Sequence, residues 1–262
     1  MRLLATLLTS FSLAVHAATP TTDFSDLWYN PNESGWGVNL AQQNEILFIT
    51  FFVYGTNGTP TWFVGPATAL SGSTQDGIVS FTGPLYTTTG PYFGAATFDP
   101  NQVAIRLVGA VSFAAGQIGV GAISYSFDGV VVTKNIQRQT WRNENISGIY
   151  VGGSLGTFSG CGAGSDGYFE SYATITVGHD GGSTVTLREE GSNYSCNYTG
   201  GYTQSGRMGQ IQGFGTCSDG SSQSFIATEV QGGLQGLTMR FSSQFAGTCI
   251  SVGRLGGVRR GS

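Results

Sequence analysis

Basic side chains are scarce in this sequence. The chain has 262 residues, of which one is a lysine (Lys134) and two are histidines, and its 15 acidic residues outnumber the 11 lysines and arginines. The only basic cluster lies near the end, at Arg254, Arg259 and Arg260. Because nucleic-acid binding depends on neutralising phosphates with basic side chains, this composition argues against a nucleic-acid partner.

Helical periodicity and long apolar runs are also missing beyond the N-terminal segment. No later segment approaches the ~20 apolar residues of a membrane helix, so we expect no transmembrane helix after it. Short apolar stretches alternate instead with turns rich in glycine, which contributes 42 residues. Aromatic residues reach 12%, which is unusual for disordered chains. The pattern predicts an all-β protein built of antiparallel strands.

The first residues have the pattern of a secretory signal peptide. Arg2 supplies a positive charge, residues 3–15 are mostly apolar, and the tripeptide at 15–17 matches a small-x-small cleavage site. We therefore predict a signal peptide over residues 1–17, cleaved after Ala17. This predicts export to the periplasm or to the outside of the cell.

Cysteines are absent from the first half of the chain and number four in the second. An even count in an exported protein predicts two disulfides, for which three connectivities are possible. We favour Cys196–Cys217, because these residues lie symmetrically about a hairpin turn expected at 206–207, and Cys161–Cys249. No C-x-x-C pair accompanies them, so a zinc site is disfavoured and no metal is expected.

The composition changes near residue 143, which we take as a domain boundary. All tryptophans and prolines lie before it and all cysteines after it. The sequence thus predicts a tryptophan-rich β-domain over residues 23–142 and a cysteine-containing β-domain over residues 143–262. The strand and turn spacing predicts two tandem antiparallel meander barrels or sandwiches, the second stapled by disulfides.

The longest apolar run of the exported part, Ile46–Tyr54, is expected to be a strand. Because strict alternation is lost, we expect both of its faces to be covered. Asn57-Gly58 after it is a strong hairpin signal. A two-residue turn at that pair places Val53 opposite Trp62.

The segment before this strand resembles a known sequence motif. The run WYNPNESGWG at residues 28–37, followed by NLAQQ at 39–43 and PTW at 60–62, resembles a segment of secreted proteobacterial proteins. That family is largely uncharacterised. The resemblance implies a bacterial, exported protein and carries no activity with it.

The two halves of the sequence resemble each other weakly at their starts and ends. FSDLW at residues 24–28 opens the first half and ISGIY at 146–150 opens the second, and arginines end each half. An aromatic residue on the first strand, capped by an arginine from the last strand, resembles the small closed barrels of the calycin type. Asp26 and Gly148 begin the triplets that end at Trp28 and Tyr150, which departs from the Gly-x-Trp pattern of that family.

Several short motifs match those of enzymes, but the neighbouring sequence lacks the elements that catalysis requires. Residues 152–156 match G-x-S-x-G and residues 162–167 match G-x-G-x-x-G, but neither is followed by a helical pattern. Paired carboxylates for glycoside hydrolysis are available only as Asp23, Asp26 and Glu33, or as Glu189-Glu190. The last two are neighbours on a predicted strand and should point to opposite faces. We therefore assign no catalytic residue and expect no cofactor.

The best candidate site is an aromatic one. We predict a ligand-binding site formed by Trp36, Glu33, Asn32, Tyr29 and Trp62, because planar rings stack on sugars or line apolar pockets while polar neighbours orient the ligand. The alternative, favoured for the strand tryptophans Trp28 and Trp62, is that these rings fill the core.

The sequence as a whole predicts an exported, non-catalytic binding or interaction protein. Its ligand is expected to be a glycan, an apolar small molecule or a secreted protein. Two alternatives remain open. One is a hydrolase of polysaccharides, which requires Glu33 and a second carboxylate in one cleft. The other is an inhibitor or partner of a secreted enzyme, which requires an exposed, ordered loop.

Overall fold

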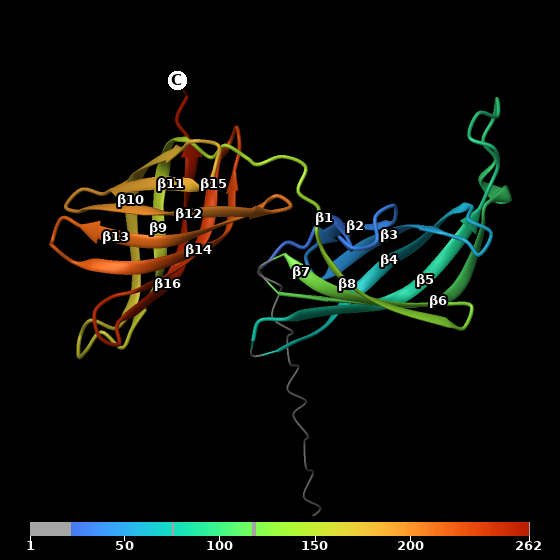
Figure 1. Ribbon diagram of the computed structural model, residues 1–262, viewed down its shortest axis with the longest axis horizontal. Coiled ribbons are helices and arrows are strands. Elements are labelled where there is room, and N and C mark those ends of the chain that lie inside the picture. Colours follow the sequence, from blue (N-terminus) through green and yellow to red (C-terminus); the bar gives the residue numbers. More distant parts are fainter. Residues whose placement is uncertain (1–21, 75, 117–118, 262) are drawn as a thin grey trace, which may run out of the picture.

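The protein consists of two closed antiparallel barrels, each of eight strands that pair in sequence order (Figure 1). The computed structural model describes residues 22–74, 76–116 and 119–261. The first barrel comprises β1 (Asp26–Tyr29), β2 (Gly37–Gln43), β3 (Ile46–Tyr54), β4 (Pro60–Ser73), β5 (Val79–Thr89), the short 3-10 helix η1 (Pro100–Gln102), β6 (Ala104–Ala115), β7 (Val120–Phe127) and β8 (Val130–Arg138). The second comprises β9 (Gly148–Ser159), β10 (Gly167–His179), β11 (Thr184–Glu190), β12 (Ser195–Ser205), β13 (Met208–Cys217), β14 (Ser222–Gly232), β15 (Gly236–Gln244) and β16 (Ile250–Arg259).

This architecture confirms the predicted all-β class and the tandem meander barrels. The junction expected at residue 143 lies in the segment between β8 and β9. The predicted signal peptide lies outside the described residues.

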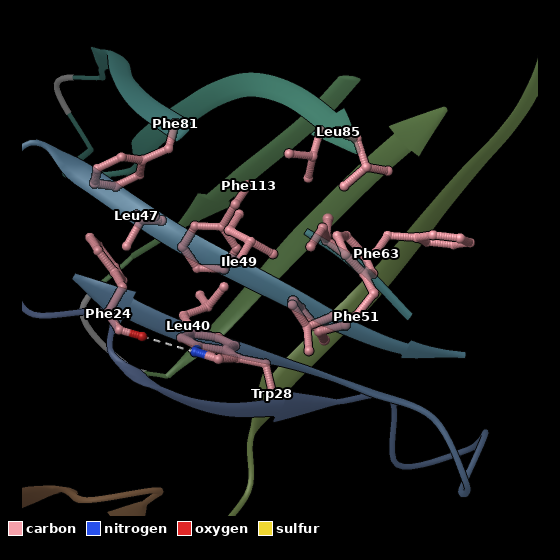
Figure 2. Packing of buried hydrophobic residues seen from close by; sticks show 14 of the residues in the cluster. Phe24, Trp28, Leu40, Leu47, Ile49, Phe51, Phe63, Phe81, Leu85 and Phe113 are labelled. Atoms are coloured by element: carbon pink, nitrogen blue, oxygen red, sulfur yellow. Dashed lines mark hydrogen bonds between the residues drawn. The ribbon is translucent and has the colours of Figure 1, made fainter. Parts of the chain in front are cut away.

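The first barrel is filled by one face of each strand. Leu47, Ile49 and Phe51 alternate along β3 and are fully buried (Figure 2). Trp28 lies among them, and its indole N–H donates to the Phe24 carbonyl oxygen at 3.0 Å. Edge-to-face aromatic contacts complete this core, which holds Phe24, Trp28, Val38, Leu40, Leu47, Ile49, Phe51, Phe63, Phe81, Leu85, Val108, Val111, Phe113, Ala115, Ile123 and Ile136.

The outer face of β3 is not covered, contrary to the sequence-based expectation. Phe48, Phe52 and Tyr54 are 44%, 53% and 59% exposed. The run reads as uniformly apolar because both the inner and the outer positions are hydrophobic. A closed barrel buries only the inner positions, and the second barrel contacts the first at its end rather than over this strand.

The β3–β4 turn also differs from the prediction. Val53 pairs with Thr61, one residue away from the expected register. The amide of Gly55 donates to the Thr59 carbonyl oxygen at 2.9 Å, so the loop has three central residues instead of two. Its last residue, Gly58, has φ 76°, a left-handed conformation that glycine adopts without strain.

The second barrel carries both disulfides, with the predicted connectivity. Cys196 and Cys217 are directly opposite each other on β12 and β13, which confirms the hairpin about residues 206–207. Cys161–Cys249 joins the β9–β10 loop to the β15–β16 loop. The core of this barrel consists of Ile146, Tyr150, Ile175, Val177, Val185, Leu187, Tyr202, Ile211, Phe225, Ala227, Val230, Leu237, Met239 and Leu255.

The two barrels are closed to different extents. In the second, β9 and β16 pair over ten residues, whereas in the first, β1 and β8 pair over two. Beyond Tyr29 the chain leaves the sheet as the loop 30–36 and returns at Gly37. The seam of the first barrel is therefore completed by side chains of this loop.

The β12–β13 turn of the second barrel docks on one end of the first (Figure 1). The amide of Arg207 donates to Asp26 Oδ2 at 3.1 Å, and the Arg207 guanidinium forms an ion pair with Asp23. The amide of Gly206 donates to Thr140 Oγ1 at 2.9 Å. Backbone and charged contacts thus fix this turn against β1 and the segment that follows β8.

Candidate functional site

Loop 30–36 is anchored by Glu33. One carboxylate oxygen of Glu33 lies 2.8 Å from Lys134 Nζ, and the other accepts from the Trp36 indole at 3.1 Å. Lys134 shares the inward face of β8 with the buried residues Ile136 and Arg138. The hydrogen bond from Lys134 lowers the pKa of Glu33 below its ordinary value. Glu33 is therefore held ionised, which suits an anchor and does not suit a general acid.

The sequence-predicted site residues are only partly brought together. Trp36 is half-buried and packs against the core, whereas Trp62 is 47% exposed on the outer side of β4, so they lie on opposite sides of the barrel wall. The Tyr29 hydroxyl accepts from Gln137 Nε2 at 3.3 Å, and the amide of Asn32 donates to Asn30 Oδ1 at 2.9 Å.

Asn32 and Glu33 border a groove of about 1200 Å³ in the first barrel. Its floor is formed by β6, β7 and β8, and a second carboxylate, Asp76, lies on its border. Both oxygens of Glu33 are already engaged by Lys134 and Trp36. Glu33 is therefore not available as one member of the carboxylate pair that a glycosidase requires.

An aromatic surface lies on the β3–β4 hairpin. We call it the β3–β4 aromatic face and define it as Phe48, Phe52, Tyr54 and Trp62. Phe52 and Trp62 are direct cross-strand neighbours. Neither β3 nor β4 contains a charged residue. Contiguous exposed apolar surface of this kind marks an interaction site in soluble proteins.

Polar and apolar groups extend this face on either side. Thr50, between Phe48 and Phe52 on β3, lies opposite Asn39 of β2 and offers hydrogen-bonding groups next to the rings. On the other side, Tyr86 of β5 pairs with Leu107 of β6, which is 61% exposed. The surface thus combines planar rings with neighbouring hydroxyl and amide groups.

The predicted site residues include only Trp62 of this face, although the sequence also places Tyr54 among the candidate aromatic residues. Phe48 and Phe52 are missed, because the expectation that both faces of Ile46–Tyr54 are covered leaves them inside. Their positions in the sequence could have identified them as exposed. Phe48, Phe52 and Tyr54 occupy even-numbered positions of the strand, in alternation with the buried residues. Lys134 was also missed, although it is the only lysine of the chain.

The G-x-S-x-G and paired-carboxylate motifs do not form catalytic sites in the described part of the chain. Ser154 of the first motif bonds Ser171 and Glu189. His179 is engaged elsewhere, with its Nε2 3.1 Å from the Gly182 carbonyl oxygen. Glu189 is buried and Glu190 exposed, so the two carboxylates point to opposite faces.

Comparison with known proteins gives no further guide. No protein-family description matches this chain, and no curated protein is significantly similar to it in sequence. Over the described residues, no helix has the length and apolar character needed to cross a membrane. The two disulfides indicate an oxidising compartment outside the cytoplasm. The chain is therefore defined by its fold, as a disulfide-bonded protein of two tandem eight-stranded barrels.

Proposed function

We propose that the protein is a non-catalytic binding protein that engages glycans through its β3–β4 aromatic face. The observation that carries the proposal is the exposure of four aromatic rings on the outer face of one hairpin, where Phe52 and Trp62 lie directly opposite each other. Aromatic rings offer large apolar faces on which sugar rings stack, and Asn39 and Thr50 add hydrogen-bonding groups beside them. Because both strands belong to a closed barrel, the rings are held in place before binding, which reduces the entropy lost on association.

Several features support a periplasmic or secreted location for this function. The signal-peptide pattern of residues 1–17 and the disulfides agree with export. The resemblance of residues 28–37 to a segment of secreted proteobacterial proteins agrees with a bacterial origin. The arginine–aromatic pairs of both barrels are consistent with a calycin-like architecture.

The test is binding to insoluble polysaccharides of several linkages, measured by co-sedimentation of the full chain. We expect Trp62→Ala to weaken binding by about tenfold, because an exposed aromatic anchor contributes roughly 1–2 kcal/mol. Trp141→Ala is the matched control, since Trp141 is 76% exposed and lies outside the face. Equal binding by both variants would refute the assignment of the site.

A protein partner is the competing occupant of this face. If no glycan binds, and Trp62→Ala instead abolishes self-association in sedimentation, the face is a contact between two copies of the chain. Each result assigns one occupant, because the same substitution is read out against both.

A further inference from the structure

The interior of the second barrel contains a buried carboxylate that has no cationic partner among the residues that the structure describes. Glu189 is 5% exposed and faces inward on β11. Its Oε1 accepts from Ser154 Oγ and from the Tyr194 hydroxyl, each at 2.8 Å. Ser171 Oγ lies 2.7 Å from the same tyrosine hydroxyl. All of these partners are neutral hydroxyl groups.

Other buried charges in the described residues are paired. Glu229 lies 2.9 Å from the Arg240 guanidinium, and Arg138 lies 3.1 Å from Asp26. A buried charge without an opposite charge is costly, because burial removes hydration that hydroxyl groups replace only in part. Glu189 therefore differs from them, because the groups of the described chain that bond it are hydroxyls and not a counter-charge.

A cavity adjoins this carboxylate. It has a volume of about 30 Å³, enough for about two water molecules. Glu189 and Ser243 are its most polar lining residues, and the remainder of the lining is Leu187, Tyr198, Phe225, Ala227, Met239, Phe241 and Leu255. The cavity thus offers one negative charge within aromatic and aliphatic walls.

The residues that line the cavity determine which kind of cation fits it. Calcium requires six to eight oxygen ligands, which this lining does not supply. An ammonium group needs one carboxylate and gains further from aromatic faces. Gln223 adds a second acceptor next to Tyr198. Its Nε2 donates to the Tyr198 hydroxyl at 3.0 Å, and its buried Oε1 has no hydrogen-bond partner within residues 22–74, 76–116 and 119–261.

A cluster of aromatic rings adjoins the cavity. Phe241, which lines it, lies 6.4 Å from Phe169, and Phe169 lies 4.7 Å from Phe158 between ring centres. Burial raises the pKa of Tyr198, and the charge of Glu189 raises it further. The Tyr198 hydroxyl therefore stays protonated beside the cavity at neutral pH.

We propose that the second barrel binds a small ammonium ion or primary amine in this cavity, with Glu189 as its counter-charge. The amine donates N–H bonds to Glu189 Oε2, because Ser154 and Tyr194 both donate to Oε1. Phe241 and Tyr198 contact its alkyl portion and its positive charge. This site is separate from the β3–β4 aromatic face and does not depend on it.

The test is titration of the full chain with methylammonium, followed by amide NMR shifts, with methanol as the neutral ligand of the same size. We expect saturable shifts at residues 187–198 with methylammonium and none with methanol. Glu189→Gln should weaken binding by about tenfold or more, because it removes the charge while keeping the shape. Glu190→Gln is the matched control on the same strand and should bind as the parent does.

Three results would overturn the proposal. These are no saturable binding of methylammonium, equal binding of methanol, or unchanged binding by Glu189→Gln. If Glu189→Gln fails to fold, the comparison of methylammonium with methanol on the parent chain decides the question by itself.

Discussion

The guanidinium of Arg138 lies 4.9 Å from the ring centre of Trp28, and the second barrel repeats this relationship between Arg259 and Tyr150 at 5.2 Å. The repetition extends to the hydrogen bonds. Trp28 Nε1 and the Tyr150 hydroxyl each donate to the carbonyl oxygen four residues earlier. The arginines donate to the Ser25 and Ser147 carbonyl oxygens, three residues before those rings. The same arrangement of an arginine, an aromatic ring and backbone carbonyl oxygens therefore closes one end of each barrel.

We predict that Arg138→Met destabilises the first barrel by about 3–5 kcal/mol. The substitution leaves Asp26 near the barrel end without its buried partner, and removing one member of a buried ion pair costs this much. The measurement is urea unfolding followed by tryptophan fluorescence. Arg142→Met, in an exposed ion pair, should change stability by less than about 1 kcal/mol. A loss below 1 kcal/mol in Arg138→Met would contradict the prediction.

The Cys161–Cys249 bond should stabilise the protein more than the Cys196–Cys217 bond. The sequence separations are 88 and 21 residues, and loop-closure entropy predicts contributions of about 4.5 and about 3 kcal/mol. We expect Cys161→Ser with Cys249→Ser to lower the unfolding free energy by about 1 kcal/mol more than the other pair of serines. Denaturant unfolding of both variants checks the order, and the reverse order would reject it.

The contact between the barrels should depend on the absence of a side chain at Gly206. A Cβ there would overlap Asp26 Oδ2 and lie 2.8 Å from Arg138 Cβ. Gly206→Ala should separate the barrels and increase the radius of gyration in small-angle scattering. Gly181→Ala is the matched control, because it also has a positive φ but has open space around its Cβ. An unchanged radius of gyration in Gly206→Ala would contradict the prediction, because it would mean that the turn accommodates the added methyl group.

Acid should release loop 30–36. The pKa of Glu33 is lowered in the folded protein, chiefly by the hydrogen bond from Lys134. Its contribution is therefore complete above the unfolded pKa, near 4.5, and is lost as the pH falls through the lower folded value. We expect Trp36 fluorescence, taken as the difference from Trp36→Phe, to change in that acidic range.

Glu33→Gln should show the acid-like Trp36 signal already at neutral pH. Asp99→Asn is the control for acid effects in general, since the pKa of Asp99 is also lowered but its partners are Asn101 and Gln102. If Glu33→Gln keeps the neutral signal of the parent, Glu33 does not anchor the loop.

The fold was largely predictable from local patterns. The turn expected at residues 206–207 sets a strand pair that the structure contains. The error at the β3–β4 turn came from its length, because a loop of three central residues shifts the pairing by one residue and changes the neighbours of Trp62.

The candidate sites were less predictable. Whether an aromatic residue is core or surface depends on which face of a strand the barrel encloses, and Trp28 and Trp62 differ in this respect. The partner of Glu33 is 101 residues away in sequence, and Ser154, which donates to Glu189, is 35 residues away from it. No local pattern encodes such contacts.

The sequence by itself determined the strand class, the two-part organisation and the disulfide pairing, because these follow from periodicity, turn chemistry and symmetric spacing about a turn. Only the tertiary structure decided which rings are exposed, that Glu33 is tied to Lys134, and that Glu189 lies beside an apolar cavity. These features arise when barrel closure brings distant strands together and divides each strand into an inner and an outer face.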